Sequence, residues 1–164
     1  MDALQATALM AATITMGIAA GVYLLYAFAI MPGLGRTDDR TFVSAFQQID
    51  TAIVGPFLLV FFIGPLVFAA GAAALHLGDG DRTTLAWIGA AIVLQRAMAG
   101  MTLGINVPRN DGIKAAGDPS NINVAAVRER FNEARWVRSN NVRAAAAAIA
   151  VGCLAWASIL HGAS

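Results

Sequence analysis

The sequence predicts an all-α integral membrane protein: a four-helix bundle formed by one domain, residues 1–164. Apolar residues make up 58% of the chain and charged residues 13%, whereas a soluble domain usually carries about a quarter charged residues. The mean hydropathy is +0.65. The apolar residues are arranged in long runs, which is typical of a protein that spans a bilayer rather than one with a globular core.

The first apolar segment covers about residues 4–31 and carries no charge, so it can span the bilayer with some tilt. Pro32 and Gly33 are expected to end it. Two glycine pairs have the spacing that lets a neighbouring helix approach closely. These pairs are Gly17 with Gly21, and Gly100 with Gly104 in the third segment.

A short amphipathic helix is expected before the second segment, with Thr41 as its cap. Its apolar side comprises Phe42, Phe46 and Ile49. The second segment covers about residues 53–77 and contains Pro56 and Pro65, which predict kinks. A polar turn at residues 78–82 then predicts a helical hairpin with the third segment.

The third segment covers about residues 84–105 and is expected to stop at Asn106-Val107-Pro108, because proline lacks the amide proton that a helix needs. Residues 123–161 contain one glycine, Gly152, and no proline, which predicts a single long helix. Its charged first half is expected to extend into the cytoplasm. Its alanine-rich second half, from about residue 142, is expected to span the membrane while packed against the other helices.

Positive charge is distributed unevenly between the two ends of this bundle. Four spans place both termini and the turn at residues 78–82 on one side, where Arg82 is the only Lys or Arg. The other side carries Arg36, Arg40, Arg109, Lys114, Arg128, Arg130, Arg135, Arg138 and Arg143. The positive-inside rule therefore predicts a multi-pass protein of the cell membrane with both termini extracytoplasmic.

The composition argues against several classes of function. The net charge of +1 leaves no strongly basic face for nucleic acid. Cys153 is the single cysteine, so it cannot form an intrachain disulfide. His76 and His161 lack a nearby carboxylate or cysteine cluster, so no metal site is expected. The lipid bilayer is the expected partner. The sequence leaves open whether the protein forms a homo-oligomer.

Polar residues at the segment ends converge on the predicted cytoplasmic face. Trp136, Asn140 and Arg143 are spaced i, i+4, i+7 and therefore form one stripe on a helix. An aromatic ring, an amide and a cation in this order suit a flat, oxygen-rich aromatic molecule, with the arginine stabilising a phenolate or enolate. Interfacial anchoring is the alternative, because Trp and Arg are common at membrane boundaries.

Three further positions are candidates. Asn106 and Asn110 flank the proline break and either bind a ligand or cap a helix end. Asp50 lies near the start of the second segment, where a partly buried carboxylate can act as a base, cap a helix or pair with an arginine. Arg96 lies near the middle of the third segment, where a charge is costly, so it is expected to face the bundle interior. Its candidate partners are Tyr23, Tyr26 and Asp50.

Four groups of residues occur in an order that resembles a known family. They are Tyr26-Ala27-Phe28 with Met31-Pro32; Phe46-Gln47-Gln48-Ile49-Asp50 with Pro56; Asn106-Val107-Pro108-Arg109-Asn110; and Trp136 with Asn140 and Arg143. Over nearly its whole length the sequence resembles the anthrone oxygenase family of small membrane proteins. It departs from the family pattern at Asp50, where asparagine is more usual, at Arg109, usually aliphatic, and at Ala144, often threonine.

The resemblance implies a membrane oxygenase that uses O2 without a metal or a flavin. Fungal members act on anthrones in polyketide pathways and give anthraquinones, so a hydrophobic aromatic small molecule is the implied substrate. From position and polarity, we expect Arg143, Asn140 and Asp50 to be catalytic. The residues expected to bind the substrate are Trp136, Asn106, Asn110, Tyr26 and Arg96.

Two alternatives from other classes share this fold. A non-catalytic binder or carrier of hydrophobic small molecules predicts a path that reaches both membrane faces. A helper subunit of a larger membrane complex predicts no pocket and a glycine pair buried against another chain. An enzyme predicts a lipid-accessible pocket walled by Trp136, Asn140 and Arg143.

Overall fold

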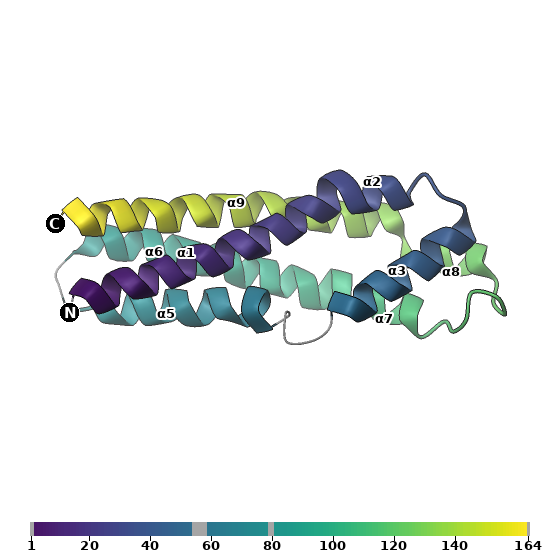
Figure 1. Ribbon diagram of the computed structural model, residues 1–164, viewed down its shortest axis with the longest axis horizontal. Helices are drawn as coiled ribbons and strands as arrows, with labels where there is room; N and C mark the ends of the chain where they lie inside the picture. Colours follow the sequence, from purple (N-terminus) through teal and green to yellow (C-terminus); the bar gives the residue numbers. More distant parts are fainter. Residues whose placement is uncertain (1, 54–58, 79–80, 164) are drawn as a thin grey trace.

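The computed structural model describes residues 2–53, 59–78 and 81–163, and within these residues the regular structure is entirely helical. Long helices run side by side in an elongated bundle (Figure 1). They are α1 (Asp2–Leu25), α5 (Gly64–His76), α6 (Arg82–Met101) and α9 (Glu133–Ala163). The start of α1, the end of α9 and the adjoining ends of α5 and α6 lie at one end of the bundle (Figure 1), which is the arrangement that four spans require.

Three helical stretches are long and apolar enough to cross a membrane: Ala3–Leu34, Arg82–Lys114 and Val124–Ala163. A shorter apolar helix covers Phe61–His76. Large apolar side chains are exposed on the outside of all these stretches, among them Met10, Ile14, Val67, Val93, Ile149 and Ile159. Such a surface is unfavourable in water and suits contact with lipid. The predicted all-α membrane bundle is confirmed.

Alanines, not the predicted glycine pairs, form the close contacts between the long helices. The buried alanines include Ala12, Ala19, Ala69, Ala91, Ala144, Ala147 and Ala150, all at most 3% exposed. A Cβ atom added at Gly17, Gly21, Gly100 or Gly104 would meet nothing within 4 Å. The expectation of close helix approach at these glycines is therefore wrong within the described chain. The prediction that the alanine-rich half of α9 packs against the other helices is confirmed.

Each of three prolines follows a π-helical segment, and the helix continues through it. The segments are η1 (Tyr26–Ile30) before Pro32 of α2 (Met31–Leu34), η2 (Leu59–Ile63) before Pro65 of α5, and η3 (Thr102–Asn106) before Pro108 of α7 (Val107–Lys114). A wider π turn shifts the hydrogen-bond register, which accommodates the missing amide proton and the proline ring. The predicted helix ends at Met31 and Ile105 are therefore wrong, and the predicted kink at Pro56 lies outside the described residues.

The predicted amphipathic helix is α3 (Asp39–Ile53), which buries Phe42 and Phe46 as expected. Its cap is Asp38, not Thr41. The Asp38 carboxylate accepts hydrogen bonds from the amide of Thr41 at 3.1 Å and from its hydroxyl at 2.6 Å. These bonds lower the pKa of Asp38. Thr41 therefore donates hydrogen bonds to the capping residue. The helix begins at Asp39, two residues before Thr41.

The predicted single helix over residues 123–161 is wrong, because Asn132 divides it. Asn132 has a left-handed backbone with φ of 54°, a conformation that asparagine tolerates better than most residues. The chain before it forms α8 (Val124–Phe131), which packs on α3 and α7. The charged helix therefore folds over one end of the bundle instead of extending away from it (Figure 1).

Arg128 of α8 holds this end of the bundle together. Its guanidinium donates to the carbonyl of Thr37 at 2.9 Å and to the carboxylates of Asp39 and Glu133 at 3.1 and 3.0 Å. It also lies over the ring of Phe42, 4.3 Å from the centroid. Arg128 thereby joins α8 to the turn that follows α2, to α3 and to the start of α9.

Replacing Arg128 by methionine is expected to destabilise the protein by about 2 kcal/mol, because the partners lose charge-assisted hydrogen bonds. Thermal unfolding in detergent measures this change. Arg130→Met is the matched control, since Arg130 is exposed and its guanidinium reaches only Ala126 of its own helix. Equal melting temperatures for the two variants would contradict the role of Arg128.

Candidate functional site

A cavity of about 360 Å³ lies between α1, the end of α3, η2, η3, α7 and α9. All three π-helical segments contribute to its wall: Tyr26 from η1, Phe61 and Phe62 from η2, and Thr102 and Asn106 from η3. π-Helical turns are rare and often mark functional sites, because the extra residue turns side chains away from their regular positions. The π-helical turns of the described residues therefore gather around one cavity.

Seven of the eight residues predicted for the site line this cavity. They are Arg143, Asn140, Asp50, Trp136, Asn106, Asn110 and Tyr26. These residues come from five segments of the chain, so the convergence expected from the order of the spans is present in the structure. Their catalytic or binding roles stay predictions.

Arg143 is a buried cation surrounded by neutral groups. Its residue is 4% exposed, and its guanidinium donates to Thr102 Oγ1 at 2.9 Å and to Asn140 Oδ1 at 3.1 Å. It lies 4.7 Å from the centroid of the Tyr23 ring. Its Nε–H has no partner, and no carboxylate of the described residues forms an ion pair with it. A buried charge without a counter-charge favours an anionic ligand.

Two amide oxygens orient this guanidinium. The fully buried Asn140 donates from its nitrogen to the carbonyl of Tyr23 at 3.0 Å, which leaves its oxygen for Arg143. The Asn106 amide satisfies its neighbours when its oxygen accepts from Arg143 Nη2 at 3.1 Å and its nitrogen donates to Ser139 Oγ at 2.7 Å. Dipoles from α9 and η3 therefore support the charge of Arg143 without neutralising it.

A second chain of hydrogen bonds leads to the carboxylate. Trp136 Nε1 donates to Asn110 Oδ1 at 2.7 Å, and Asn110 Nδ2 donates to Asp50 Oδ1 at 2.7 Å. The indole can only donate and the carboxylate can only accept, so the Asn110 amide has one orientation. Lys114 Nζ lies 2.8 Å from Asp50 Oδ2. Asp50 therefore pairs with a lysine, not with the arginine that was one expected partner.

Trp136 is part of the interior and not a surface anchor. It is 3% exposed, and its ring centroid lies 5.3 Å from that of Tyr26 and 5.8 Å from that of Phe46. Phe131 packs against the same indole, with centroids 6.3 Å apart. The interfacial-anchoring alternative is therefore wrong for Trp136, whose position is fixed by aromatic neighbours and by Asn110.

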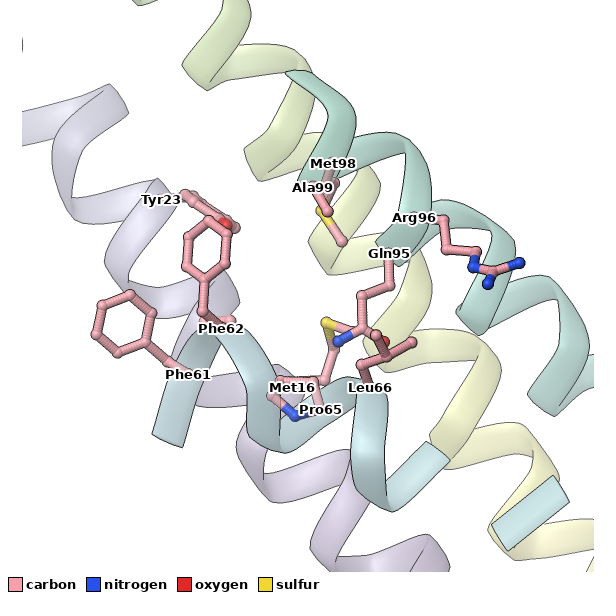
Figure 2. Close-up of a pocket in the computed structure, with 11 residues that line it drawn as sticks. Met16, Tyr23, Phe61, Phe62, Pro65, Leu66, Gln95, Arg96, Met98 and Ala99 are labelled. Atoms are coloured by element: carbon pink, nitrogen blue, oxygen red, sulfur yellow. The ribbon is translucent and has the colours of Figure 1, made fainter. Parts of the chain in front are cut away.

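Arg96 is exposed, so the expectation that it faces the bundle interior is wrong. It is among the residues that line a small neighbouring cavity, and Figure 2 shows its guanidinium end pointing away from the other labelled side chains. Successive helical residues point about 100° apart, and in this register Gln95 takes the inward position and is 7% exposed. The flexible stem of an outward arginine lets its charged end reach toward a polar region.

Arg109 and the two histidines lie outside the cavity wall. The Arg109 guanidinium donates to the carbonyl of Ile105 at 2.7 Å. This backbone carbonyl before Pro108 is therefore hydrogen-bonded by an arginine and not by the side-chain amides of Asn106 and Asn110. His76 Nε2 lies 3.4 Å from His161 Nδ1. Within the described residues, no three His, Cys, Asp or Glu side chains gather to hold a metal ion.

Direct partners of the predicted residues were not themselves predicted for the site: Tyr23 as the ring beneath Arg143, Thr102 as its hydrogen-bond acceptor, and Lys114 as the partner of Asp50. A signal for the last two was present. Thr102, Asn106, Asn110 and Lys114 recur at every fourth position, which places them on one helix face. The proline at 108 obscured this pattern, because it was taken to end the helix. No sequence signal distinguishes Tyr23.

The sequence model of the anthrone oxygenase family matches residues 57–153, more than half of the chain. The chain belongs to this family. No curated protein and no solved structure matches it. The match to the anthrone oxygenase family includes Arg143 and its partners Thr102, Asn106 and Asn140. Asp50 and both tyrosines of the cavity wall lie outside the matched range.

Proposed function

We propose that this member of the anthrone oxygenase family oxidises a hydrophobic, anthrone-like aromatic substrate with O2 to a quinone, without a metal or a flavin. The observation that carries the proposal is Arg143. Its buried guanidinium has only neutral partners and lines a cavity rich in aromatic side chains. An enolate formed beside Arg143 supplies the negative partner that its guanidinium lacks.

The shape of the cavity supports entry of such a substrate from the bilayer. Leu103 lines the cavity and is 67% exposed on the outside of the bundle, so the cavity adjoins the lipid-facing surface there. Val22, Ile53 and Phe62 provide apolar walls. A neutral tricyclic molecule partitions into the hydrocarbon of the bilayer, and from there it can reach the polar side chains of the cavity without passing through water.

Asp50 and Arg143, which carry opposite charges, line the same cavity, as do Lys114 and Asp111, which form an ion pair with each other. Tyr26 lines the same cavity, and its ring centroid lies 5.3 Å from that of Trp136. An anthrone carries its acidic methylene and its ketone oxygen on opposite sides of the middle ring. In the proposed complex the methylene faces Asp50 and the ketone oxygen faces Arg143, with Asn140 and Asn106 holding the guanidinium in place.

In the proposed reaction, Asp50 takes a methylene proton and the electron pair moves into the ketone oxygen, where Arg143 stabilises it. The enolate carbon transfers electrons to O2 and forms a C–O bond. The protonated Asp50 returns its proton to the resulting peroxide anion, which gives the hydroperoxide. Loss of the second proton from the same carbon breaks the O–O bond, releases water and leaves the quinone. The substrate supplies every electron, and one O2 is consumed per quinone formed.

The test is oxidation of anthrone in ¹⁸O2 by the detergent-purified protein, at a pH low enough to suppress autoxidation. We expect one labelled oxygen in the quinone, the other in water, and a rate proportional to protein concentration. Heat-denatured protein and empty detergent micelles are the controls. A rate equal to that of both controls would refute the proposed activity.

A further inference from the structure

A second, smaller cavity lies beside the first, toward the end of the bundle where α1 begins. Its volume is about 50 Å³, and it lies between α1, η2, α5 and α6 (Figure 2). Apolar side chains form most of its wall, among them Met16, Ala19, Phe62, Met98 and Ala99. It is too small for a ring system and large enough for a small molecule of two atoms.

The two cavities share part of their wall. Tyr23, Phe61 and Phe62 line both, and the Tyr23 and Phe62 rings lie together at one side of the small cavity (Figure 2). The Arg143 guanidinium lies over the Tyr23 ring, 4.7 Å from its centroid. The small cavity is therefore separated from the substrate cavity by aromatic side chains.

The chemistry of the lining favours a nonpolar occupant over water. An ordered water needs two to four polar partners. Eight of the eleven lining residues are apolar, and the other three are Tyr23, Gln95 and Arg96. Gln95 Oε1 is buried without a hydrogen-bond partner, and the guanidinium end of Arg96 points away (Figure 2). Leu66 lines the cavity and is 37% exposed, so the cavity adjoins the lipid-facing surface. Dry apolar cavities of proteins bind nonpolar guests such as xenon.

We propose that this small cavity is a binding site for O2, which enters from the bilayer and reaches the substrate past the Tyr23 and Phe62 rings. O2 is nonpolar and dissolves better in hydrocarbon than in water, so the bilayer interior is its natural source. The kinetic part of this inference rests on the proposed oxygenase function. The binding of a nonpolar gas does not depend on it.

The test compares Ala99→Leu with Ala97→Leu. Ala99 lines the cavity, whereas Ala97 is exposed on the same helix two residues away. Xenon is the probe for binding, measured through the ¹²⁹Xe chemical shift during titration of the detergent-purified protein. We expect saturable binding in the wild type and in Ala97→Leu, and its loss in Ala99→Leu. In the oxygen assay, Ala99→Leu is expected to raise the KM for O2 several-fold while leaving the KM for anthrone unchanged.

Equal xenon binding in all three proteins would overturn the O2 site. If neither the wild type nor the variants oxidise anthrone, the proposed function is refuted. The xenon titration then still shows whether the small cavity binds a nonpolar gas. Should Ala99→Leu not fold, Ala19→Val fills the same cavity from α1. Loss of xenon binding together with an unchanged KM for O2 would also refute the proposal, because the gas would then reach the substrate by another route.

Discussion

Replacing Arg143 by methionine is expected to lower kcat for anthrone oxidation by about two to three orders of magnitude, the usual effect of removing an oxyanion donor. The charge on the ketone oxygen develops as the methylene proton leaves, so the arginine contributes more in the transition state than in the bound ground state. The KM for anthrone is therefore expected to change much less than kcat. Oxygen uptake at several anthrone concentrations gives both constants.

The same variant is expected to melt within a few degrees of the wild type. Removal of the guanidinium leaves the Asn140 oxygen without a donor and removes one donor from the Asn106 oxygen, which is unfavourable. It also removes the desolvation penalty of a buried charge that has no carboxylate partner. These two effects have opposite signs and similar size, and methionine fills a comparable volume.

Arg138→Met is the matched control, because Arg138 is an exposed arginine on the same helix. It is expected to leave both kcat and the melting temperature unchanged. If Arg143→Met unfolds the protein, the arginine has a structural role. A folded Arg143→Met protein with the kcat of the wild type would remove Arg143 from the mechanism.

Short-range helical spacing predicted most of the site. The stripe of Trp136, Asn140 and Arg143 needs only that one helix be regular over two turns, which α9 is. Asn106 and Asn110 were placed near it because the number of spans brings both segments to the same end of the bundle. These predictions depend on the apolar pattern and on local geometry, and both are encoded in the sequence within a few residues.

The errors arose where one residue changes the backbone or the register. Proline was expected to end two helices, but a π turn before Pro32 and Pro108 lets each continue. Asn132 interrupts a helix that has no glycine or proline at that point. The choice between Gln95 and Arg96 as the inward residue depends on which helices surround α6, which no local pattern gives. The aromatic ring of Tyr23 meets Arg143 through tertiary packing alone.

Asp50→Asn is expected to lower kcat by two to four orders of magnitude, roughly the range for loss of a positioned base. Asparagine keeps the shape of the side chain, and its oxygen can still accept from Asn110. Lys114 keeps Asp111 as a partner at 3.3 Å, so the variant should fold. With anthrone deuterated at the methylene carbon, the isotope effect on kcat should increase in the variant, because proton removal becomes fully rate-limiting.

Lys114→Gln tests whether the ion pair or the carboxylate alone is required. It removes the cation 2.8 Å from Asp50 and leaves Asp50 in place. It is expected to keep most of the activity of the wild type, whereas an activity as low as that of Asp50→Asn would indicate that the ion pair acts as a unit. An Asp50→Asn protein with unchanged kcat would exclude Asp50 as the base. That result would fit the resemblance described above, in which asparagine is more usual at this position. Tyr26, which also lines the cavity, would then become the next candidate for mutation.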